Sequence, residues 1–433
     1  MRTTVKMQWE LAPEPDFRLV DQLSREVNLP PLITKIIVSR GLTDPAEINR
    51  FVNPSMDDLD DPFLIPGMVA AVDRAIQALH ENETILIYGD YDVDGITAAS
   101  LMFLVLNRLG ANVHYYLPNR LVEGYGLSEE GILEAEKKRA SLIISVDTGI
   151  TAINEVEYAK DKFIDCVITD HHEPGETLPV AAALVNPKLS KGDQGNELSG
   201  VGVAYKFAQG LYRKLGQDER ELEEHLDLVA LGTSADVVPL VKDNRILTHF
   251  GIEQLLRSSK PGLKSLVFRS NLMGKDISTS QIVFVLAPRI NAVGRLGKAE
   301  KAIQLLTTKD SIVAGEIAKF LDDENERRKA IDENTLHEAL AMIDEIVDLE
   351  NDKAIVLSSE GWHQGVIGIV ASRLVERYYL PTVLIAVDGN EGKGSGRSIP
   401  GFHLHEALKS CDDLLLRYGG HKYAAGLTIS PDR

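Results

Sequence analysis

The stretch TILIYGDYDVDGITAASLMFLVLNRLG (residues 84–110) decides the fold of this 433-residue chain. Its first five residues form an apolar run rich in β-branched and aromatic side chains, as buried strands are. A turn with three aspartates follows, and apolar residues then recur at helical spacing from Ile96 to Leu109. The stretch therefore predicts one strand–turn–helix unit of a parallel α/β sheet.

The same unit recurs further along the chain. Short apolar runs at 113–117, 142–146 and 164–169 alternate with segments of helical period. We expect these runs and the first one to form a parallel sheet that is buried on both faces. After Pro187 the pattern becomes mostly helical, and its clearest segments lie at 200–215, 222–235 and 245–256.

A charged region separates this part from a second α/β pattern. Residues 310–352 have apolar side chains at helical spacing and no Gly or Pro after Gly315, which predicts one or two long exposed helices. Strand signals resume at 354–357 and 382–386, with a helix at 365–378 between them. We therefore predict four parts: an N-terminal segment packed on the first domain (1–75), a first α/β domain (76–309), a helical connector (310–352) and a smaller α/β domain (353–433).

Composition excludes several classes of protein. The chain has 46 Lys and Arg against 65 Asp and Glu, a net charge of −19, so it does not coat nucleic acid by bulk positive charge. Its two cysteines form no CxxC pair, which argues against a disulfide framework or a zinc–thiolate site. Residues 1–30 contain no apolar signal region, and we expect a cytoplasmic protein with no membrane contact. The abrupt stop after a glycine-rich run predicts a C-terminally truncated chain.

Three acidic signatures end three of the predicted strands. They are YGDYDVDG (88–95), SVDTG (145–149) and TDHHEP (169–174). Because the carboxyl ends of parallel strands meet at one edge of a sheet, these side chains are expected to converge there. So many carboxylates would raise one another's pKa unless a cation neutralised them. Oxygen and imidazole ligands in this number suit two Mn²⁺ or Mg²⁺ ions, which favours hydrolysis of a phosphate ester.

Two simpler interpretations compete with a metal site. An aspartate-rich turn is often only a solvated loop. The first signature also matches part of a calcium-binding EF-hand loop, with Asp90, Asp92, Asp94 and Gly95 at positions 1, 3, 5 and 6. The twelfth position would then be Leu101 instead of Glu, and a strand precedes the turn, so the EF-hand interpretation fails. Three clusters in register at strand ends argue against a simple loop.

At these motifs the sequence resembles the DHH phosphoesterase superfamily, and within it the RecJ exonucleases specific for single-stranded DNA. LGTSADVVPL (231–240) resembles the fourth family motif, while PNRLVEGYGL (118–127) and APRINAVGRLG (287–297) resemble RecJ-specific segments. SGRS (395–398) and GGHKYAAG (419–426) resemble the DHHA1 domain. The resemblance implies an α/β protein in which long helices join a parallel-sheet DHH domain to a smaller α/β DHHA1 domain.

The resemblance also implies a set of site residues, by their positions in the motifs. The implied metal ligands are Asp92, Asp94, Asp147, His171 and Asp236, with Asp94 or Asp147 as the bridge between the ions. His172 would contact the scissile phosphate, and Asp170 would orient a histidine. Related pyrophosphatases and nano-RNases have a histidine ligand where this chain has Tyr88, so Asp90 is a candidate for the ligand that replaces it.

Contacts to DNA phosphates require local positive charge even in an acidic protein. Family pattern and glycine context give the candidates Arg120, Arg289, Asn291, Arg295, Arg397, Ser398, Gly419, Gly420 and His421. We expect Arg397 in a glycine-rich turn whose amides also reach an anion. For any single arginine, a surface ion pair is the competing interpretation. GVGVAYKF (200–207) opens a helix whose first amides could bind a terminal phosphate, or whose glycines could serve helix packing.

The resulting hypothesis is a metal-dependent exonuclease that degrades single-stranded DNA from 5′ to 3′ into mononucleotides in DNA repair and recombination. One alternative is a DHH-family phosphodiesterase for short oligonucleotides or cyclic dinucleotides. A non-enzyme alternative is a Cdc45-like replisome scaffold, against which the intact acidic motifs argue. The resemblance further implies single-strand-binding protein and a RecQ-type helicase as partners, and we expect a monomer.

Overall fold

The computed structural model describes residues 9–119, 123–124, 126–190 and 197–432. These residues divide into two compact units, Leu11–Asp322 and the part from Asp323 onward, and each is described by itself. The boundary falls within a single helix, α15 (Ser311–Ile346). This helix lies inside the range for which the sequence predicts one or two helices.

The larger unit is built on a parallel sheet with the strand order β2-β1-β3-β4-β5. Its strands are β1 (Thr84–Gly89), β2 (Asn112–Tyr116), β3 (Ala140–Val146), β4 (Asp165–Thr169) and β5 (Ala183–Val185). The first four confirm the predicted α/β sheet, whereas the three-residue β5 was not predicted. From β1 the chain adds β2 on one side, and then crosses back to add β3 on the other side of β1. Ligands bind in open α/β sheets at such a switch point, here between β1 and β3.

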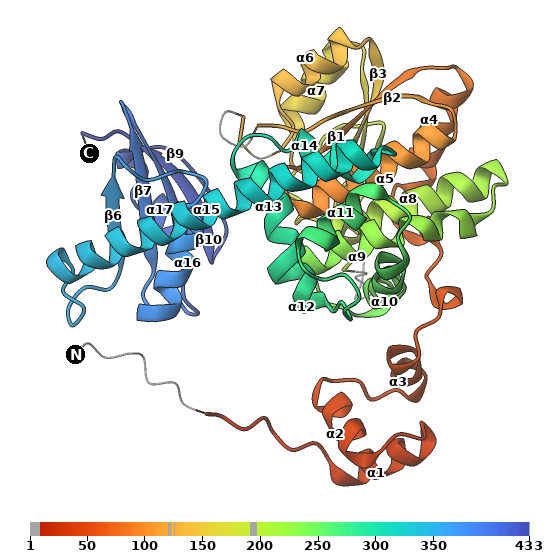
Figure 1. Cartoon of the computed structure of the whole chain (residues 1–433), viewed down its shortest axis with the longest axis horizontal. Helices are drawn as coiled ribbons and strands as arrows, with labels where there is room; N and C mark the ends of the chain where they lie inside the picture. The colour runs from red at the N-terminus through yellow and green to blue at the C-terminus, as the bar shows by residue number, and fades with distance from the viewer. Residues whose placement is uncertain (1–8, 120–122, 125, 191–196, 433) are drawn as a thin grey trace. The chain divides into compact units, whose positions relative to one another are not determined.

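Both faces of this sheet are covered by helices (Figure 1). They are α4 (Met68–His80), α5 (Val93–Arg108) and α8 (Gly200–Leu215) on one face, and α6 (Glu129–Lys137) and α7 (Ile153–Asp161) on the other. In β1, Ile85 and Ile87 belong to the first core and Leu86 and Tyr88 to the second. Because alternate side chains of a strand point to opposite faces, this double burial explains an apolar run without polar alternation.

Further helices complete the larger unit. They are η3 (Pro187–Leu189), η4 (Glu219–His225), α9 (Leu226–Ala235), α10 (Lys242–Arg257), α11 (Pro261–Arg269), α12 (Thr279–Gln281), the π-helix η5 (Ile282–Leu286), α13 (Ala287–Arg295) and α14 (Glu300–Thr307). The single helix predicted at 222–235 is in fact the 3₁₀ helix η4 followed by α9.

The N-terminal helices have a small apolar core of their own. They are α1 (Phe17–Glu26), α2 (Pro31–Ser39) and α3 (Pro45–Val52), and the short 3₁₀ helices η1 (Met56–Asp58) and η2 (Pro62–Leu64) follow them. Arg245 of α10 donates a hydrogen bond to the carbonyl of Phe51 and stacks on its ring, with 3.7 Å from the guanidinium carbon to the ring centroid. This contact joins α3 to α10 within the larger unit.

The smaller unit contains a mixed sheet of order β6-β7-β8-β10-β9, in which only the β6–β7 pair is parallel. Its elements after α15 are β6 (Ile355–Ser359), α16 (Ile367–Tyr378), β7 (Thr382–Asp388), β8 (Glu391–Arg397), α17 (Leu404–Lys409), η6 (Asp412–Leu414), β9 (Leu415–Gly420) and β10 (Ala424–Ile429). Along β7, Leu384 packs with α15 and α16, and Val383 packs with α17.

The expectation that Arg397 lies in a glycine-rich turn is wrong, because it is the last residue of strand β8. The glycines before it serve close packing. A Cβ atom on Gly394 would lie 2.6 Å from the Leu427 side chain, and one on Gly396 would lie 2.8 Å from that of Leu404. Small residues are therefore needed in this strand for its neighbours to approach.

Among the described residues, no single helix is long and apolar enough to cross a membrane. One bent pair, Met56–Leu64 followed by Met68–His80, meets the length and composition test only when its two parts are taken together.

Candidate metal centre

The first acidic signature forms the turn between β1 and α5. Asp92 caps α5 by accepting a hydrogen bond from the Gly95 amide at 3.1 Å, and Asp94 lies in the first turn of the helix. A Cβ atom on Gly95 would lie 2.6 Å from the backbone of Asp90, so this turn requires glycine at that place. Asp90 and Asp94 are buried at the carboxyl edge of the sheet as a result.

Two further carboxylates reach the same edge at or next to a residue with left-handed backbone. Asp147 follows β3 with φ of 61° and is 2% exposed, and its amide donates to the Thr169 carbonyl at 3.0 Å. Asp236 caps the end of α9, and the next residue, Val237, also has φ of 61°. Left-handed backbone costs about 1–2 kcal/mol at a residue other than glycine, and more at a β-branched one. Such strain is concentrated at functional sites.

His171 lies at the centre of the carboxylates. Its Nε2 atom is 3.1 Å from Asp147 Oδ1, 3.6 Å from Asp236 Oδ2 and 3.9 Å from Asp94 Oδ2. Three groups of side chains have ligand atoms within 4.8 Å of one another: Asp90, Asp92 and Asp147; Asp94, His171 and Asp236; and Asp147, His171 and His172. The five residues implied as metal ligands, and the candidate Asp90, all belong to these groups. The groups overlap at Asp147 and His171, as neighbouring ion positions with shared ligands would.

The donor set fits a divalent cation. Asp147 Oδ1, His171 Nε2 and Asp236 Oδ2 are buried and make no hydrogen bond among the described residues. Burial raises the pKa of Asp94 well above its usual range, and the neighbouring Asp236 and Asp92 raise it further. Burial and the adjacent carboxylates, chiefly that of Asp94, do the same to the pKa of Asp147. A cation would reverse both effects, because it stabilises the ionised carboxylates.

Asp170 belongs to none of the three groups and instead holds His172. Its Oδ1 atom lies 2.7 Å from His172 Nδ1 and accepts the amides of both histidines, while Oδ2 accepts the Ile150 amide at 2.9 Å. Burial opposes ionisation of Asp170, but the contact with His172 and these hydrogen bonds outweigh it and lower the pKa of the carboxyl. In the same way Asp170 outweighs burial at His172, whose pKa is raised.

Tyr88, which stands where related enzymes have a histidine ligand, has a different partner. Its hydroxyl donates to the Gly126 carbonyl at 3.0 Å and lies 3.2 Å from Ser128 Oγ. Its ring packs in the core beneath α6 and α7. The side chain therefore connects β1 to the chain before α6. Asp90, like Asp92 and Asp94 of the same turn, belongs to a metal-ligand group.

The amides that open helix α8 do not serve a terminal phosphate, contrary to that expectation. Gly200 donates to Asp94 Oδ2 at 2.6 Å and Val201 donates to Asp94 Oδ1 at 2.9 Å. A Cβ atom on Gly200 would lie 2.4 Å from Asp147 Oδ1. The glycine thus lets the start of α8 approach the carboxylates of Asp94 and Asp147. The helix-packing alternative predicted a close approach at these glycines, but not that it would be to carboxylates.

The DNA-binding candidates of the larger unit differ in their surroundings. Arg289 makes an ion pair with Asp322 at 2.8 Å, as the competing ion-pair interpretation predicts. Asn291 and Arg295 lie on α13, which packs closely on the first acidic signature: a Cβ atom on Gly294 of that helix would lie 2.3 Å from the Tyr91 carbonyl. Arg120 lies outside the described residues.

The candidates of the smaller unit gather where β8 meets the turn between β9 and β10. The Ser398 amide donates to the carbonyl of Tyr423 at 2.9 Å, and the Ser398 hydroxyl donates to Phe402 at 3.1 Å. Arg397 donates to the Gly396 carbonyl at 2.7 Å. Gly419 and Gly420 end β9, and His421 stands exposed in the turn.

Comparison with known proteins agrees with this architecture. Residues 84–233 match the DHH family, N-terminal domain, and residues 351–433 match the DHHA1 domain. The single-stranded-DNA-specific exonuclease RecJ of Dickeya dadantii is 40% identical over 425 residues, which cover 94% of this chain and 73% of the relative. The chain belongs to the RecJ family. RecJ of Bacillus subtilis is 42% identical over 433 residues, 99% of this chain and 54% of that protein.

A solved RecJ structure has the same fold. RecJ from Thermus thermophilus in complex with Mn²⁺ superposes with a TM-score of 0.85 at 33% identity, covering 98% of this chain and 60% of that one. The chain thus spans about half to two thirds of the length of these two RecJ proteins. The predicted resemblance to the RecJ family is confirmed.

Proposed function

We propose that this chain is a metal-dependent exonuclease that degrades single-stranded DNA from 5′ to 3′ into mononucleotides, in DNA repair and recombination. The observation that carries the proposal is the overlap of three ligand groups at the carboxyl edge of the sheet, with Asp147 and His171 shared. RecJ relatives are named as exonucleases specific for single-stranded DNA, and one was solved with Mn²⁺. Both support the same reaction and the same ions.

The residues would divide the work between ion binding and substrate orientation. Asp90, Asp92, Asp94, Asp147, His171 and Asp236 would hold two Mn²⁺ or Mg²⁺ ions, which supply an activated water and stabilise the leaving oxygen. Asp170 fixes the ring of His172 at 2.7 Å, and this half-exposed ring would contact the scissile phosphate. Fixing the ring in advance avoids an entropic cost when the substrate binds.

The proposed DNA contacts of the larger unit are Arg120, Asn291 and Arg295. Those of the smaller unit are Arg397, Ser398, Gly419, Gly420 and His421. For Arg289 the ion pair with Asp322 supports a role in holding α13 against α15. The proposed domains are 1–75, 76–309, 310–352 and 353–433; the DHH match at 84–233 and the DHHA1 match at 351–433 support the second and fourth.

The finer proposals concern place and partners. Because its relatives are named as DNA exonucleases, we propose that the chain acts in the cytoplasm as a monomer, with single-strand-binding protein and a RecQ-type helicase as partners. Light scattering on the purified chain tests the monomer, and binding to each purified partner tests the association.

One experiment tests the reaction. The chain is incubated with Mn²⁺ and one of four substrates, beside an Asp147→Ala control. Three substrates are 5′-labelled, namely single-stranded DNA, double-stranded DNA and a dinucleotide, and the fourth is cyclic di-AMP. We expect labelled mononucleotide from the single strand only, and none with the control. Preference for the dinucleotide or for cyclic di-AMP would favour the phosphodiesterase alternative. Binding of DNA without hydrolysis of any substrate would favour the scaffold.

A further inference from the structure

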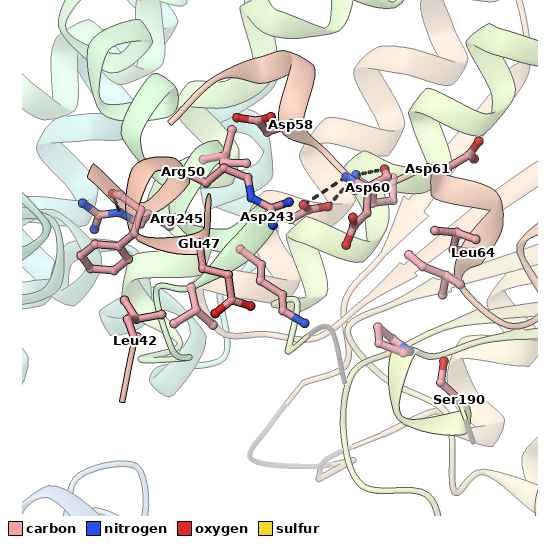
Figure 2. A pocket seen from close by; sticks show the side chains of 17 residues that line it. Leu42, Glu47, Arg50, Asp58, Asp60, Asp61, Leu64, Ser190, Asp243 and Arg245 are labelled. Carbon is pink, nitrogen blue, oxygen red and sulfur yellow. Dashed lines mark hydrogen bonds and ion pairs between the residues drawn. The ribbon is translucent and has the colours of Figure 1, made fainter. Parts of the chain in front are cut away.

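The first turn of helix α10 sends consecutive side chains to distant parts of the larger unit. Asp243 pairs with Lys206 of α8 at 2.6 Å and accepts the Asp60 amide at 3.2 Å. Lys206 also donates to the Asp60 carbonyl at 2.6 Å. Asp60 and Asp243, labelled in Figure 2, line a cavity of about 560 Å³. These contacts tie α8 to the chain that follows the N-terminal helices.

Asn244, the next residue, is 2% exposed and bonds to two other loops. Its Oδ1 accepts the Ser199 amide at 3.3 Å. Its Nδ2 donates to the carbonyls of Glu197 and Pro239, the latter at 3.1 Å. One amide side chain therefore bridges the loop that enters α8 and the loop that leaves α9.

The loop that enters α8 determines where Asp94 lies. Ser199 caps this helix by accepting the Gly202 amide at 3.1 Å, and its hydroxyl bonds to that of Thr233 at 2.7 Å. The two amides after Ser199 then hold both carboxylate oxygens of Asp94. A shift of Ser199 would consequently move these amides away from Asp94.

The loop that leaves α9 begins at Asp236, which caps the end of that helix. Val237 follows with φ of 61° and a side chain that is 76% exposed, so packing of that side chain does not compensate for its backbone strain. Strain of this kind persists only where the surroundings hold the chain in place. The hydrogen bond from Asn244 to the Pro239 carbonyl, two residues after Val237, holds it from the α10 side.

We propose that Asn244 is a positioning residue for the metal centre, which fixes the spacing of Asp94 and Asp236 by bonding to the loops that carry their supports. It touches neither ion nor substrate in this role. The inference rests on the proposed metal site and adds a residue to it that is neither acidic nor a histidine. Hydrogen-bonded supports of metal ligands commonly contribute 10–100-fold to metal affinity.

The test measures Mn²⁺ affinity by calorimetry, and thermal unfolding in EDTA, on the whole 433-residue chain. Asn244→Ala is expected to weaken Mn²⁺ binding about tenfold or more. The neighbouring Asp243→Asn, which breaks the buried pair with Lys206, is the matched control: it lowers the unfolding midpoint but leaves the Mn²⁺ Kd within about twofold of the wild type. A purely structural role for Asn244 would make the two variants alike in both measurements.

A second variant keeps the test decisive if Asn244→Ala does not fold. Thr233→Val has nearly the same shape and removes the other side-chain bond to Ser199, so it should weaken Mn²⁺ binding several-fold. Wild-type Mn²⁺ affinity in the folded variants would overturn the inference alone. A wild-type chain that binds no Mn²⁺ would overturn the proposed function, and the inference with it.

Discussion

Replacing Asp147 by Asn should stabilise the metal-free chain while it abolishes tight Mn²⁺ binding. Asp147 is buried, its carboxylate oxygen makes no hydrogen bond among the described residues, and it faces other carboxylates. Asparagine tolerates the left-handed backbone of this position and nearly matches aspartate in size. The substitution therefore removes a charge at little steric cost.

The expected gain follows from the spacing of the charges. Ligand oxygens of Asp90, Asp92 and Asp147 lie within 4.8 Å of one another. At an effective dielectric constant of about 20, two unit charges at that distance repel by about 3.5 kcal/mol. Partial protonation relieves much of this, so we expect the free energy of unfolding in EDTA to rise by roughly 1–3 kcal/mol, or by about 2 °C or more in the midpoint per kcal/mol.

The sign of the pH dependence follows from the raised pKa of Asp94 and Asp147. Between the unfolded pKa and the raised folded pKa, the native state binds more protons than the unfolded state. Their stabilising contribution is therefore complete at acidic pH and is lost as the pH rises through the folded values. In EDTA the wild type should lose more stability than Asp147→Asn between weakly acidic and neutral pH.

The matched control is Asp227→Asn, at an equally buried carboxylate. Asp227 pairs with Lys260 at 2.8 Å and accepts a hydrogen bond from Ser258 at 2.7 Å. Removing its charge leaves Lys260 without its counter-ion, which should destabilise the chain by about 3–5 kcal/mol. Urea unfolding in EDTA measures both variants. A loss of stability in Asp147→Asn comparable to that in Asp227→Asn would refute the reasoning, because it would show no net repulsion at the site.

Two further predictions concern other parts of the larger unit. Gly200→Ala should weaken Mn²⁺ binding about tenfold and cost about 1–3 kcal/mol, because its methyl group would lie 2.4 Å from Asp147 Oδ1. Gly315→Ala in α15, whose added methyl group would meet no atom within 4 Å, should leave calorimetric Mn²⁺ affinity unchanged. Equal affinities in the two variants would contradict this. Burial and the nearby charge of Lys260 lower the pKa of His225 to about 3. The neutral ring therefore contributes to stability above the unfolded pKa of about 6.5, and this contribution is lost as the pH falls. Urea unfolding at pH 7 and 5 should show the wild type losing about 2 kcal/mol more than His225→Gln; parallel losses would show that His225 already takes up a proton at pH 5 in the folded chain.

The sequence predicts the parallel sheet and the meeting of its acidic ends because both depend on local patterns. A doubly buried strand such as β1 must be apolar throughout, and topology alone then brings Asp90 and Asp147 to one edge. The predicted ligands that follow strands belong to groups in the structure for that reason, whereas Asp236 reaches its group from the end of helix α9. The three-residue β5 was not predicted because so short a strand leaves no recognisable pattern.

The supports of the site follow from tertiary contacts that no local pattern records. Asn244 bonds to residues 45 and 47 positions earlier in the chain, and no spacing rule links such positions. The two amides that clamp Asp94 come from a glycine-containing helix start, which suggested a phosphate site because free helix amides attract any anion. The sequence thus predicts that these amides bind an anion, but the anion is the carboxylate of Asp94 in the same chain instead of a phosphate. The partner of Arg289, in the charged helix α15, was equally invisible to local patterns.

The metal centre concentrates terms that oppose folding. Crowded carboxylates, left-handed Asp147 and left-handed Val237 all occur at the carboxyl edge of the sheet. The apolar strands and the network around Asn244 must offset these costs, and bound ions would remove the largest of them. An ion at a hundred times its Kd contributes about 2.7 kcal/mol to stability, which is comparable to the repulsion estimated for Asp147. A chain arranged in this way gains stability when it gains its cofactor, so metal occupancy and folding stability should rise and fall together.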